Sequence, residues 1–397
     1  MAAAPKSLAD ANEQPPWYPG ALLEVPCDTS SFENGLPSPW GRVYGWSVTD
    51  ALQPGWWQEP HEGIWGDWPT EVGHVEVLSQ GVSGISVLVN DAFVAHLYPF
   101  QTGKDVSNLA LFEPWRTSLD DAPLLLPIAG MKNQHGDQIA VFPRHQAVEP
   151  SDAVPRAHEL VNTLGRIHAA LVPHATPNTE RRWNERLKAI EDQLKTTTLW
   201  RAPHTKHVVG LPPVNAHLGC FADVEGGLFV VPQPRPLVDH LLAPEERLPG
   251  VATVAMLEQL LSLEDVFATT AERREFYERW GDVVPSGWTS PSTLSTANGG
   301  VWIWRYHAML LMLAEAKAFG HKERVKQCDR WLFDVSRIQA RLGELRTVHA
   351  VRRGGLWVAA IAAVFGSPAV QVPTVVGSLA VSLVAHIVHQ RRMPPPF

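Results

Sequence analysis

The residues whose types could support chemistry gather between positions 204 and 240. His204 and His207 lie three residues apart, and His217 and His240 follow in the same stretch. Imidazoles at such a spacing suit a transition metal. The chain has no His-Glu-x-x-His motif, however, and loop histidines beside Pro and Thr are typical of a protein surface. A surface position is therefore the favoured interpretation of His204 and His207, with a metal site as the alternative.

The same stretch contains two aspartates, Asp223 and Asp239. Carboxylates bind Mg²⁺ and accept protons from hydroxyl groups, so both are candidates for metal or base chemistry. Serine-hydrolase chemistry has less support, because Ser83, in Gly81-Val-Ser-Gly, does not stand in a Gly-x-Ser-x-Gly motif. His168 lies on the apolar side of a helical pattern, which is typical of a hydrogen-bonded core histidine.

Length and composition indicate a large folded protein. The chain has 397 residues, of which 45% are hydrophobic and 19% charged, and its net charge is −8. A mildly acidic chain lacks the basic face of a general nucleic-acid binder. Cys27, Cys220 and Cys328 form no Cys-x-x-Cys pair, which predicts reduced thiols in a cytosol-like compartment. Residues 1–34 carry no apolar signal segment and are expected to be a flexible leader.

Residues 35–148 show a pattern of strands and turns. Ile85–Val89 and Ala92–Tyr98 flank the turn Asn90–Asp91, which predicts a hairpin. Leu124–Ile128 and Gln138–Phe142 form a second predicted pair. A cluster of six tryptophans precedes these strands; it is interpreted as core packing, with an aromatic ligand cage as the alternative. These tryptophans are Trp40, Trp46, Trp56, Trp57, Trp65 and Trp68.

Residues 149–347 change to a helical period. Apolar residues recur at helical spacing from His158 to Leu171, which predicts an amphipathic helix. A broadly apolar run begins at Trp302 and is expected in the core of a helical lobe. The helices predicted after the one that contains His168 cover Trp183–Leu199, Val251–Leu263, Ala271–Trp280, Trp302–Phe319 and His321–Leu345.

The C-terminal part, residues 348–397, is expected to associate with a membrane. Residues 356–388 contain no Asp, Glu, Lys or Arg, and Arg352–Arg353 and Arg391–Arg392 flank them. A helix that crosses a bilayer needs about 20 apolar residues. Gly366, Pro368 and Pro373 interrupt the run. The interruption predicts a shallow hairpin of two short helices, 356–365 and 374–388, with both arginine pairs at one headgroup surface.

Two alternatives for this tail remain open. A single span could run from about Ala369 to Val388, or the two helices could pack on the body or form an oligomer contact. The basic flanks suit anionic lipid headgroups and predict the cytoplasmic face of a membrane. His386 and His389 suit an interface and would be costly in the middle of a bilayer if charged.

The order of these segments resembles one known family. The hairpin at 85–98 is followed by the strand pair 124–128 and 138–143, and then by the helix motif Leu164-Gly-Arg-Ile-His-Ala-Ala-Leu. This order resembles the aminoglycoside phosphotransferase-like branch of the protein-kinase-like fold, over about Val72 to Leu345. The resemblance implies an α+β fold of two lobes, a β-rich N-lobe at 35–148 and a helical C-lobe at 149–347, followed by the apolar helical tail.

The resemblance also places the family's functional positions on this chain. The strand lysine that holds the nucleotide falls at about His96, the catalytic aspartate at about His217, and the metal-binding asparagine at about Ala222. Asp223 stands one position late. Asp239, in Pro236-Leu-Val-Asp-His, matches the second metal-binding aspartate. Phosphoryl transfer needs a cation on the phosphates, Mg²⁺ ligands and a base, and these groups act as a unit. The substitutions therefore predict a pseudokinase.

Three hypotheses about function follow. The first is a catalytically silent kinase-like scaffold or regulatory subunit, attached to a membrane or membrane complex through residues 356–388. The second is an active small-molecule phosphotransferase that uses ATP and Mg²⁺, with Asp223 and Asp239 supplying relocated chemistry. The third is a structural subunit of a membrane assembly. Under the first and third, the partners are other protein subunits and membrane lipid, and nucleic acid is not expected.

Overall fold

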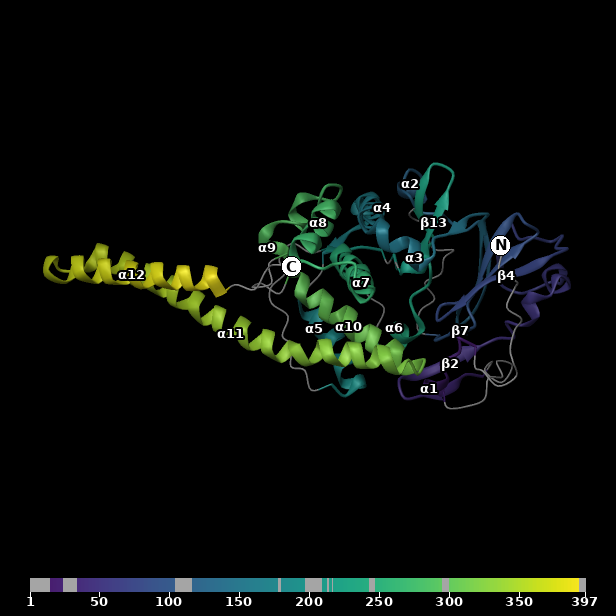
Figure 1. The fold of residues 1–397 in the computed structure, drawn as a ribbon, viewed down its shortest axis with the longest axis horizontal. Coiled ribbons are helices and arrows are strands. Elements are labelled where there is room, and N and C mark those ends of the chain that lie inside the picture. The colour runs from purple at the N-terminus through teal and green to yellow at the C-terminus, as the bar shows by residue number, and fades with distance from the viewer. Residues whose placement is uncertain are drawn as a thin grey trace.

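The chain folds into a strand-rich N-terminal region, a helical C-terminal region and a long helical hairpin that projects from the body (Figure 1). The computed structural model describes residues 15–23, 34–103, 116–177, 180–196, 209–212, 214, 215, 217–242, 247–294 and 300–392. The order of strands followed by helices confirms the α+β fold class expected from the sequence.

An antiparallel sheet of six strands forms the N-terminal region, in the order β3-β8-β9-β6-β5-β4. Alternate residues of its central strands, such as Ile85, Val87 and Val89, are almost fully buried and belong to the main hydrophobic core. The strands of this sheet are β3 (Ile64–Gly66), β4 (Val75–Gly81), β5 (Gly84–Val89), β6 (Phe93–Leu97), β8 (Ala129–Asn133) and β9 (Gly136–Pro143).

The hairpin predicted around Asn90–Asp91 is confirmed as β5 and β6. Both turn residues have positive φ, 50° and 54°, a conformation that Asn and Asp tolerate in two-residue hairpin turns. The Asn90 side chain also accepts hydrogen bonds from the backbone N–H groups of Gly73 and His74, at 2.8 and 3.2 Å. The turn therefore fixes the segment that leads into β4.

The strand predicted at 124–128 is displaced in the structure. β8 begins only at Ala129, and in the preceding segment a single bridge joins Leu124 to Val230. Gly130 lies inside β8, where an added Cβ would be 2.6 Å from the ring of Trp65 and 2.6 Å from the carbonyl oxygen of Ile139. Glycine is required here by close packing, so its presence does not mark a turn.

Residues 15–23 differ from the expected flexible leader. Trp17 and Tyr18 are buried at 3% and 2% exposure and pack their rings against Phe100 at 6.0 and 5.8 Å, and the short helix α1 (Gly20–Leu23) follows them. Burying two aromatic rings provides enough free energy to hold a short segment in place. The tryptophan cluster is likewise packed in the core, where Trp57 and Trp68 stack at 4.9 Å.

Small sheets and helices complete the body. The remaining strands are β1 (Leu36–Ser38), β2 (Gly41–Gly45), β7 (Phe100–Gln101), β10 (Gln146–Ala147), β11 (Thr176–Pro177), β12 (Val209–Gly210), β13 (Phe221–Val224) and β14 (Gly227–Val230). The helices after α1 are α2 (Arg116–Leu119), α3 (Pro150–Ala153), α4 (Ala157–Ala170), α5 (Glu180–Leu194), α6 (Leu237–Leu242), α7 (Gly250–Leu263), α8 (Thr270–Gly281), α9 (Pro291–Leu294), α10 (Gly300–Ala318), α11 (Lys322–Phe365) and α12 (Pro368–Arg392).

A buried ion cluster joins three helices of the C-terminal region. Glu258 of α7 is fully buried and accepts two hydrogen bonds of 2.6 Å from Arg305 of α10. Arg273 and Tyr277 of α8 donate to the same carboxylate at 2.9 and 2.8 Å. Burial alone would raise the pKa of Glu258, but the two guanidiniums lower it, so the group stays ionised. The cluster fixes α7, α8 and α10 relative to one another.

The apolar tail forms an antiparallel hairpin that extends away from the body (Figure 1). By length and composition, both α11, with 44 residues, and the stretch Ala369–Arg391 of α12, with 23, could cross a membrane. Only 6% and 11% of their most apolar windows are buried. The alternative in which these helices pack on the body therefore does not hold for this structure. The turn lies at Gly366–Ser367, and Pro373 lies inside α12.

Candidate functional site

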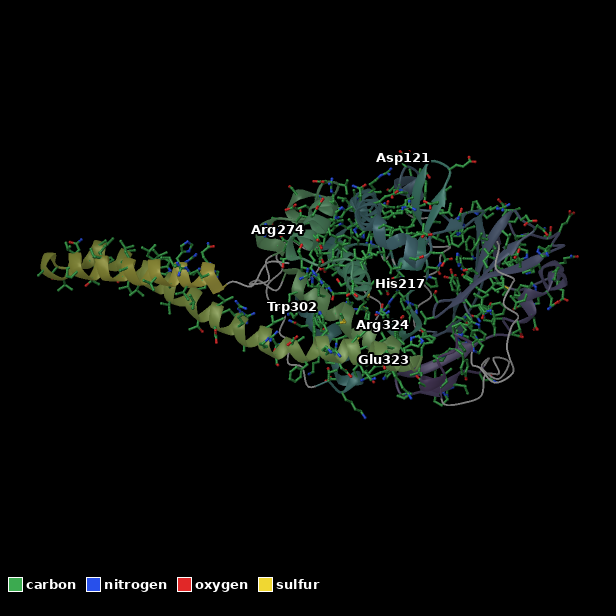
Figure 2. The ribbon with its side chains drawn as sticks, in the orientation of Figure 1. Asp121, His217, Arg274, Trp302, Glu323 and Arg324 are labelled. Atoms are coloured by element: carbon green, nitrogen blue, oxygen red, sulfur yellow. The ribbon has the colours of Figure 1, made fainter. Side chains whose placement is uncertain are left out.

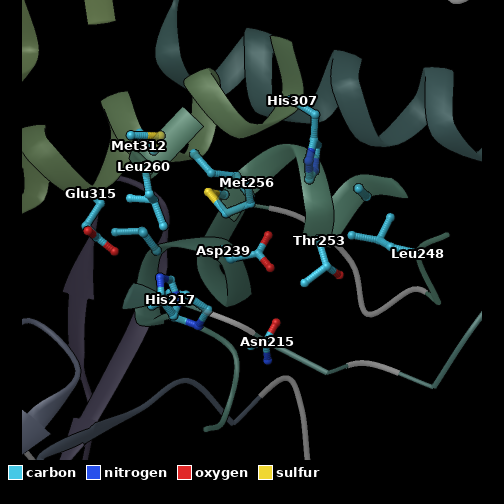
Figure 3. A pocket seen from close by; sticks show the side chains of 14 residues that line it. Asn215, His217, Asp239, Leu248, Thr253, Met256, Leu260, His307, Met312 and Glu315 are labelled. Carbon is cyan, nitrogen blue, oxygen red and sulfur yellow. The ribbon is translucent and has the colours of Figure 1, made fainter. Parts of the chain in front are cut away.

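A cavity of about 430 Å³ lies between the sheet and the helical region. One wall comes from the strand-rich region, including the β4–β5 turn and residues 98–102. The opposite wall comes from residues 217–220 and 233–240 and from the end of α10. Figure 2 shows His217 at this junction. A smaller cavity of about 80 Å³ continues inward from it and shares His217 and Glu315 with the larger one (Figure 3).

The glycine-containing turn between β4 and β5 borders the larger cavity. Gly81, Val82 and Ser83 line it, and Gly84 follows with a φ of +129°. A Cβ on Gly84 would lie 2.1 Å from the carbonyl oxygen of Leu97, so only glycine fits. The turn therefore brings backbone and the Ser83 side chain to the edge of the cleft.

Asp239 lies on α6 in a second buried ion cluster. Its Oδ1 accepts a hydrogen bond of 2.5 Å from Arg186 of α5, and its Oδ2 accepts one of 2.9 Å from Arg235. Arg186 also donates to Nε2 of His307 at 2.9 Å. Burial by itself would raise the pKa of Asp239, but the two guanidiniums outweigh it and hold that pKa well below its usual range. Asp239 is thus a permanent anion whose two oxygens both have cationic partners.

Arg186 and Arg235 are partners that sequence reasoning missed. Arg235 stands four residues before Asp239, a spacing that brings side chains together on a helix, so this signal was available in the sequence. Arg186 comes from a predicted charged helix, and nothing in its local sequence indicates that it is 1% exposed. Its burial depends on how α5 packs against α6, which a single sequence does not reveal.

Glu315 and His217 are two of the titratable groups that line the cleft, and both border the two cavities. Burial raises the pKa of Glu315 to about 7, with Arg324 opposing that rise. Burial lowers the pKa of His217, although the nearby Asp239 carboxylate opposes this change. The sequence reasoning missed Glu315, yet a lone acid inside the apolar run 302–319 was the signal for it. Around neutral pH the cleft therefore holds one carboxyl group close to its midpoint of ionisation.

His96, expected at the position of the strand lysine, lies on β6 and is half-buried. Its Nδ1 lies 2.8 Å from Oγ of Ser86, and its ring packs edge-on against Phe142 at 5.4 Å. Burial, together with the neighbouring His145, lowers the pKa of His96 to about 3. His96 is not among the described residues that line either cavity. A neutral imidazole in this position supplies no positive charge to the cleft.

Asp223 and Ala222 lie on β13, away from Asp239. Arg156 donates two hydrogen bonds of 2.8 Å to the Asp223 carboxylate, and these bonds lower its pKa. Both side chains of this ion pair are at the surface, and Asp223 does not border either described cavity. Ala222 is buried between its strand partners Ala147 and Phe229. Asp223 and Asp239 therefore take part in two separate ion pairs.

These residues do not fit a Mg²⁺–nucleotide site of the kind that the resemblance implies. Mg²⁺ needs several oxygen ligands, whereas both oxygens of Asp239 are held by arginines and Asp223 is on another surface. Within the described ranges, no group of three or more His, Cys, Asp or Glu side chains is placed to hold a metal ion. His204 and His207 lie outside the described residues.

The motif around Leu164 has a structural explanation. A Cβ on Gly165 would lie 2.5 Å from Val283 and 3.0 Å from Trp280, so this glycine lets α4 approach α8 closely. His168 is buried, and its Nδ1 accepts a hydrogen bond of 3.1 Å from Trp280. Burial lowers the pKa of His168 to about 3. The expected hydrogen-bonded core histidine is therefore present.

Comparisons with known proteins return structural likenesses of low score. No protein-family model matches the chain, and no curated protein matches it. A glucosamine kinase in complex with glucosamine, ADP and phosphate is 13% identical, with a TM-score of 0.38, and the match covers 74% of this chain and 87% of that one. A choline kinase from Cryptosporidium parvum is 10% identical, with a TM-score of 0.43 and coverage of 75% and 95%.

An aminoglycoside 2'-phosphotransferase in complex with GDP is also similar. It is 13% identical, with a TM-score of 0.40, and the match covers 67% of this chain and 92% of that one. These three proteins have the kinase-like phosphotransferase fold, which is the fold that the sequence resembles. The likeness concerns the fold alone.

Proposed function

We propose that this protein is a catalytically silent, kinase-like scaffold or regulatory subunit that the α11–α12 hairpin attaches to a membrane. The observation that carries the proposal is that both carboxylate oxygens of Asp239 are bound by arginines. Asp239 is the one acidic residue at a position where the sequence resemblance places a metal ligand, and Arg186 and Arg235 hold its two carboxylate oxygens inside the protein.

The charges around Asp239 oppose binding of Mg²⁺ there. Two guanidiniums already neutralise the carboxylate, so a divalent cation would enter beside two fixed positive charges in a poorly solvated place. The other expected groups do not compensate, because His96 is neutral and borders neither described cavity, and Ala222 has no ligand atom. Without a cation on the phosphates and without metal ligands, phosphoryl transfer loses its main sources of rate.

The alternative of an active phosphotransferase requires Asp223 and Asp239 to act together. Each carboxylate instead has its own arginine partners, in places that share no cavity. Nothing in the described site favours this alternative, so it enters the proposal only as an outcome of the test. A structural subunit of a membrane assembly differs from the proposed scaffold only in whether the cleft has a ligand.

The hairpin supports the membrane part of the proposal. Its exposed side chains are largely apolar, among them Trp357, Phe365 and Val372 at 69%, 82% and 66% exposure. Exposing so much apolar surface to water is costly, and a bilayer or a partner protein would remove that cost. The arginines at the base favour the cytoplasmic face, and we propose other protein subunits as the partners of the body.

The test measures binding and hydrolysis of ATP by the full chain in detergent micelles. We expect no Mg²⁺-dependent ATP hydrolysis above background. Turnover that Asp239→Asn abolishes, while the matched surface change Asp223→Asn leaves it intact, would overturn the silent assignment. If both variants keep the same activity, the turnover comes from a contaminant. Circular dichroism of each variant checks that Asp239→Asn still folds.

A further inference from the structure

A polar cluster lies at the base of the hairpin, where α11 and α12 come together. One guanidinium nitrogen of Arg352 lies 3.1 Å from Nδ1 of His386, and another lies 3.5 Å from Nε2 of His349. The rings of His349 and His389 are 5.6 Å apart. Ser382 donates a hydrogen bond to the backbone carbonyl of Arg352, which locks the two helices together at this level.

This cluster has an excess of positive charge and no acidic partner. The last acidic residue of the chain is Glu344, and the 53 residues that follow include no Asp or Glu. Among the described residues, the side-chain partners of the Arg352 guanidinium are imidazoles and include no carboxylate. Arginines of the body behave differently, since Arg156, Arg186 and Arg305 each bind a carboxylate. The arginines that follow Glu344 are Arg346, Arg352, Arg353, Arg391 and Arg392.

Arg352 differs from its neighbour Arg353 in its surroundings. Arg352 is half-buried and its guanidinium contacts two imidazoles, whereas Arg353 is exposed and contributes charge near His349 without a described hydrogen bond to either ring. The imidazole nitrogens that face Arg352 can only accept hydrogen bonds from its guanidinium. A guanidinium has five N–H donors in a planar fork that matches phosphate oxygens, and two imidazoles use only some of them.

The length of the hairpin sets how deep it could enter a bilayer. At 1.5 Å per residue, α11 extends about 18 Å from Arg353 to Phe365, and α12 extends about 27 Å from Pro368 to His386. These lengths exceed one leaflet but fall short of the hydrocarbon core of about 30 Å. The turn at Gly366–Ser367 lies at one end of the hairpin, and at the other end Arg352 of α11 lies beside His386 of α12.

We propose that His349, Arg352, His386 and His389 form a binding site for the phosphate of an anionic phospholipid, with the hairpin inserted from one leaflet. The proposal rests on the membrane attachment proposed above and names its ligand. The phosphate would supply the negative charge that the cluster lacks. Net anionic lipids are favoured over zwitterionic ones because Arg346, Arg353 and Arg391 add positive charge around the site.

Flotation of the full chain with vesicles tests the site. The lipids are phosphatidylcholine alone or phosphatidylcholine mixed with phosphatidylglycerol. We expect tighter binding to the mixed vesicles. Arg352→Gln should weaken that binding by tenfold or more, because it removes charge-assisted hydrogen bonds, whereas Arg353→Gln should weaken it by about fivefold, the effect of one surface charge. Thermal unfolding of both variants checks that each is folded.

The outcomes separate this site from the attachment itself. Equal losses for Arg352→Gln and Arg353→Gln would show diffuse charge and overturn the site, while the attachment would stand. Equal binding to both vesicle types would also overturn the phosphate site and leave the membrane attachment standing. No flotation with either vesicle type would overturn the attachment and, with it, the site. If soluble glycerol phosphate bound the protein as tightly as the mixed vesicles do and displaced it from them, the ligand would be a free phosphate and not a lipid.

A second measurement tests the depth of insertion. With Ser367→Cys in the turn, a membrane-impermeant maleimide should not label the vesicle-bound protein from either side, although it should do so in detergent. Wild type is the matched control, because it reports any labelling of the native cysteines, of which Cys220 and Cys328 are buried. Labelling of the introduced thiol from inside the vesicle would show that the hairpin crosses the bilayer and would overturn insertion from one leaflet.

Discussion

Replacing Glu315 by Gln should change how the stability of the protein depends on pH. The wild-type carboxyl has a pKa of about 7 in the folded protein, against an ordinary value of 4.5, because partial removal from water at the cleft disfavours its charged form. The folded state therefore keeps a proton that the unfolded chain releases between these two values. Stability from this group is fully present below about pH 4.5 and is lost as the pH rises through about 7.

The size of the effect follows from the shift. A difference of 2.5 pH units between 4.5 and about 7 corresponds to about 3.4 kcal/mol at most. Glu315 is only half-buried, so contact with water reduces the measurable change to about 2 kcal/mol. Gln does not titrate. Glu315→Gln should therefore gain about 2 kcal/mol of stability relative to wild type between pH 5 and pH 8.

The assay is urea unfolding followed by tryptophan fluorescence at a series of pH values, in a fixed detergent. Glu323→Gln, an exposed change at the start of α11, serves as the matched control. Arg324→Gln should enlarge the effect, because Arg324 opposes the rise in the pKa of Glu315. Parallel stability curves for wild type and Glu315→Gln from pH 5 to pH 8 would refute the assignment of a raised pKa to this carboxyl.

Three further substitutions test the packing around the site. Glu258→Gln should lower the free energy of unfolding by about 3–5 kcal/mol, because it leaves the buried Arg305 without a charged partner. Urea unfolding measures this loss. The exposed Glu275→Gln is the control and should change the free energy of unfolding by less than about 0.5 kcal/mol. Gly66→Ala should lower the free energy of unfolding by about 1–3 kcal/mol, since the φ of Gly66 is +72° and an added Cβ would lie 2.2 Å from the carbonyl oxygen of Ile128. Thermal unfolding measures this. Gly55→Ala is the control and should stay close to wild type, because no atom lies within 4 Å of an added Cβ there. Arg156→Ala should cost less than about 1 kcal/mol, because its ion pairs with Glu159 and Asp223 are exposed, and a loss as large as that of Glu258→Gln would contradict this account.

Local sequence patterns predicted much of the fold. The hairpin at Asn90–Asp91, the amphipathic helix through His168 and the apolar helix from Trp302 all occur. These elements depend on short-range periodicity and turn chemistry, which a single sequence displays. The kinase-like order of strands and helices is likewise present in the structure.

The errors arise where distant contacts decide the local structure. The sequence predicted separate helices at 321–345 and 356–365, yet α11 continues from one to the other through Gly354 and Gly355. A Cβ on Gly355 would lie 2.9 Å from both the carbonyl oxygen of Ser378 and Oγ of Ser382, so glycine here permits close contact between helices. Similarly, the burial of Arg186 depends on tertiary packing, and no local pattern reports it.

The continuity of α11 has a mechanical consequence. Its first turns are anchored to the body, where Cys328 and Val335 are buried and Trp331 stacks on Trp302 at 4.8 Å. The same helix reaches Arg352, about 42 Å beyond Arg324 at the edge of the cleft. A continuous helix of this length is stiff and holds its two ends at a fixed separation. Whatever surface holds the hairpin therefore also sets the height and the angle at which the cleft faces the surrounding solution.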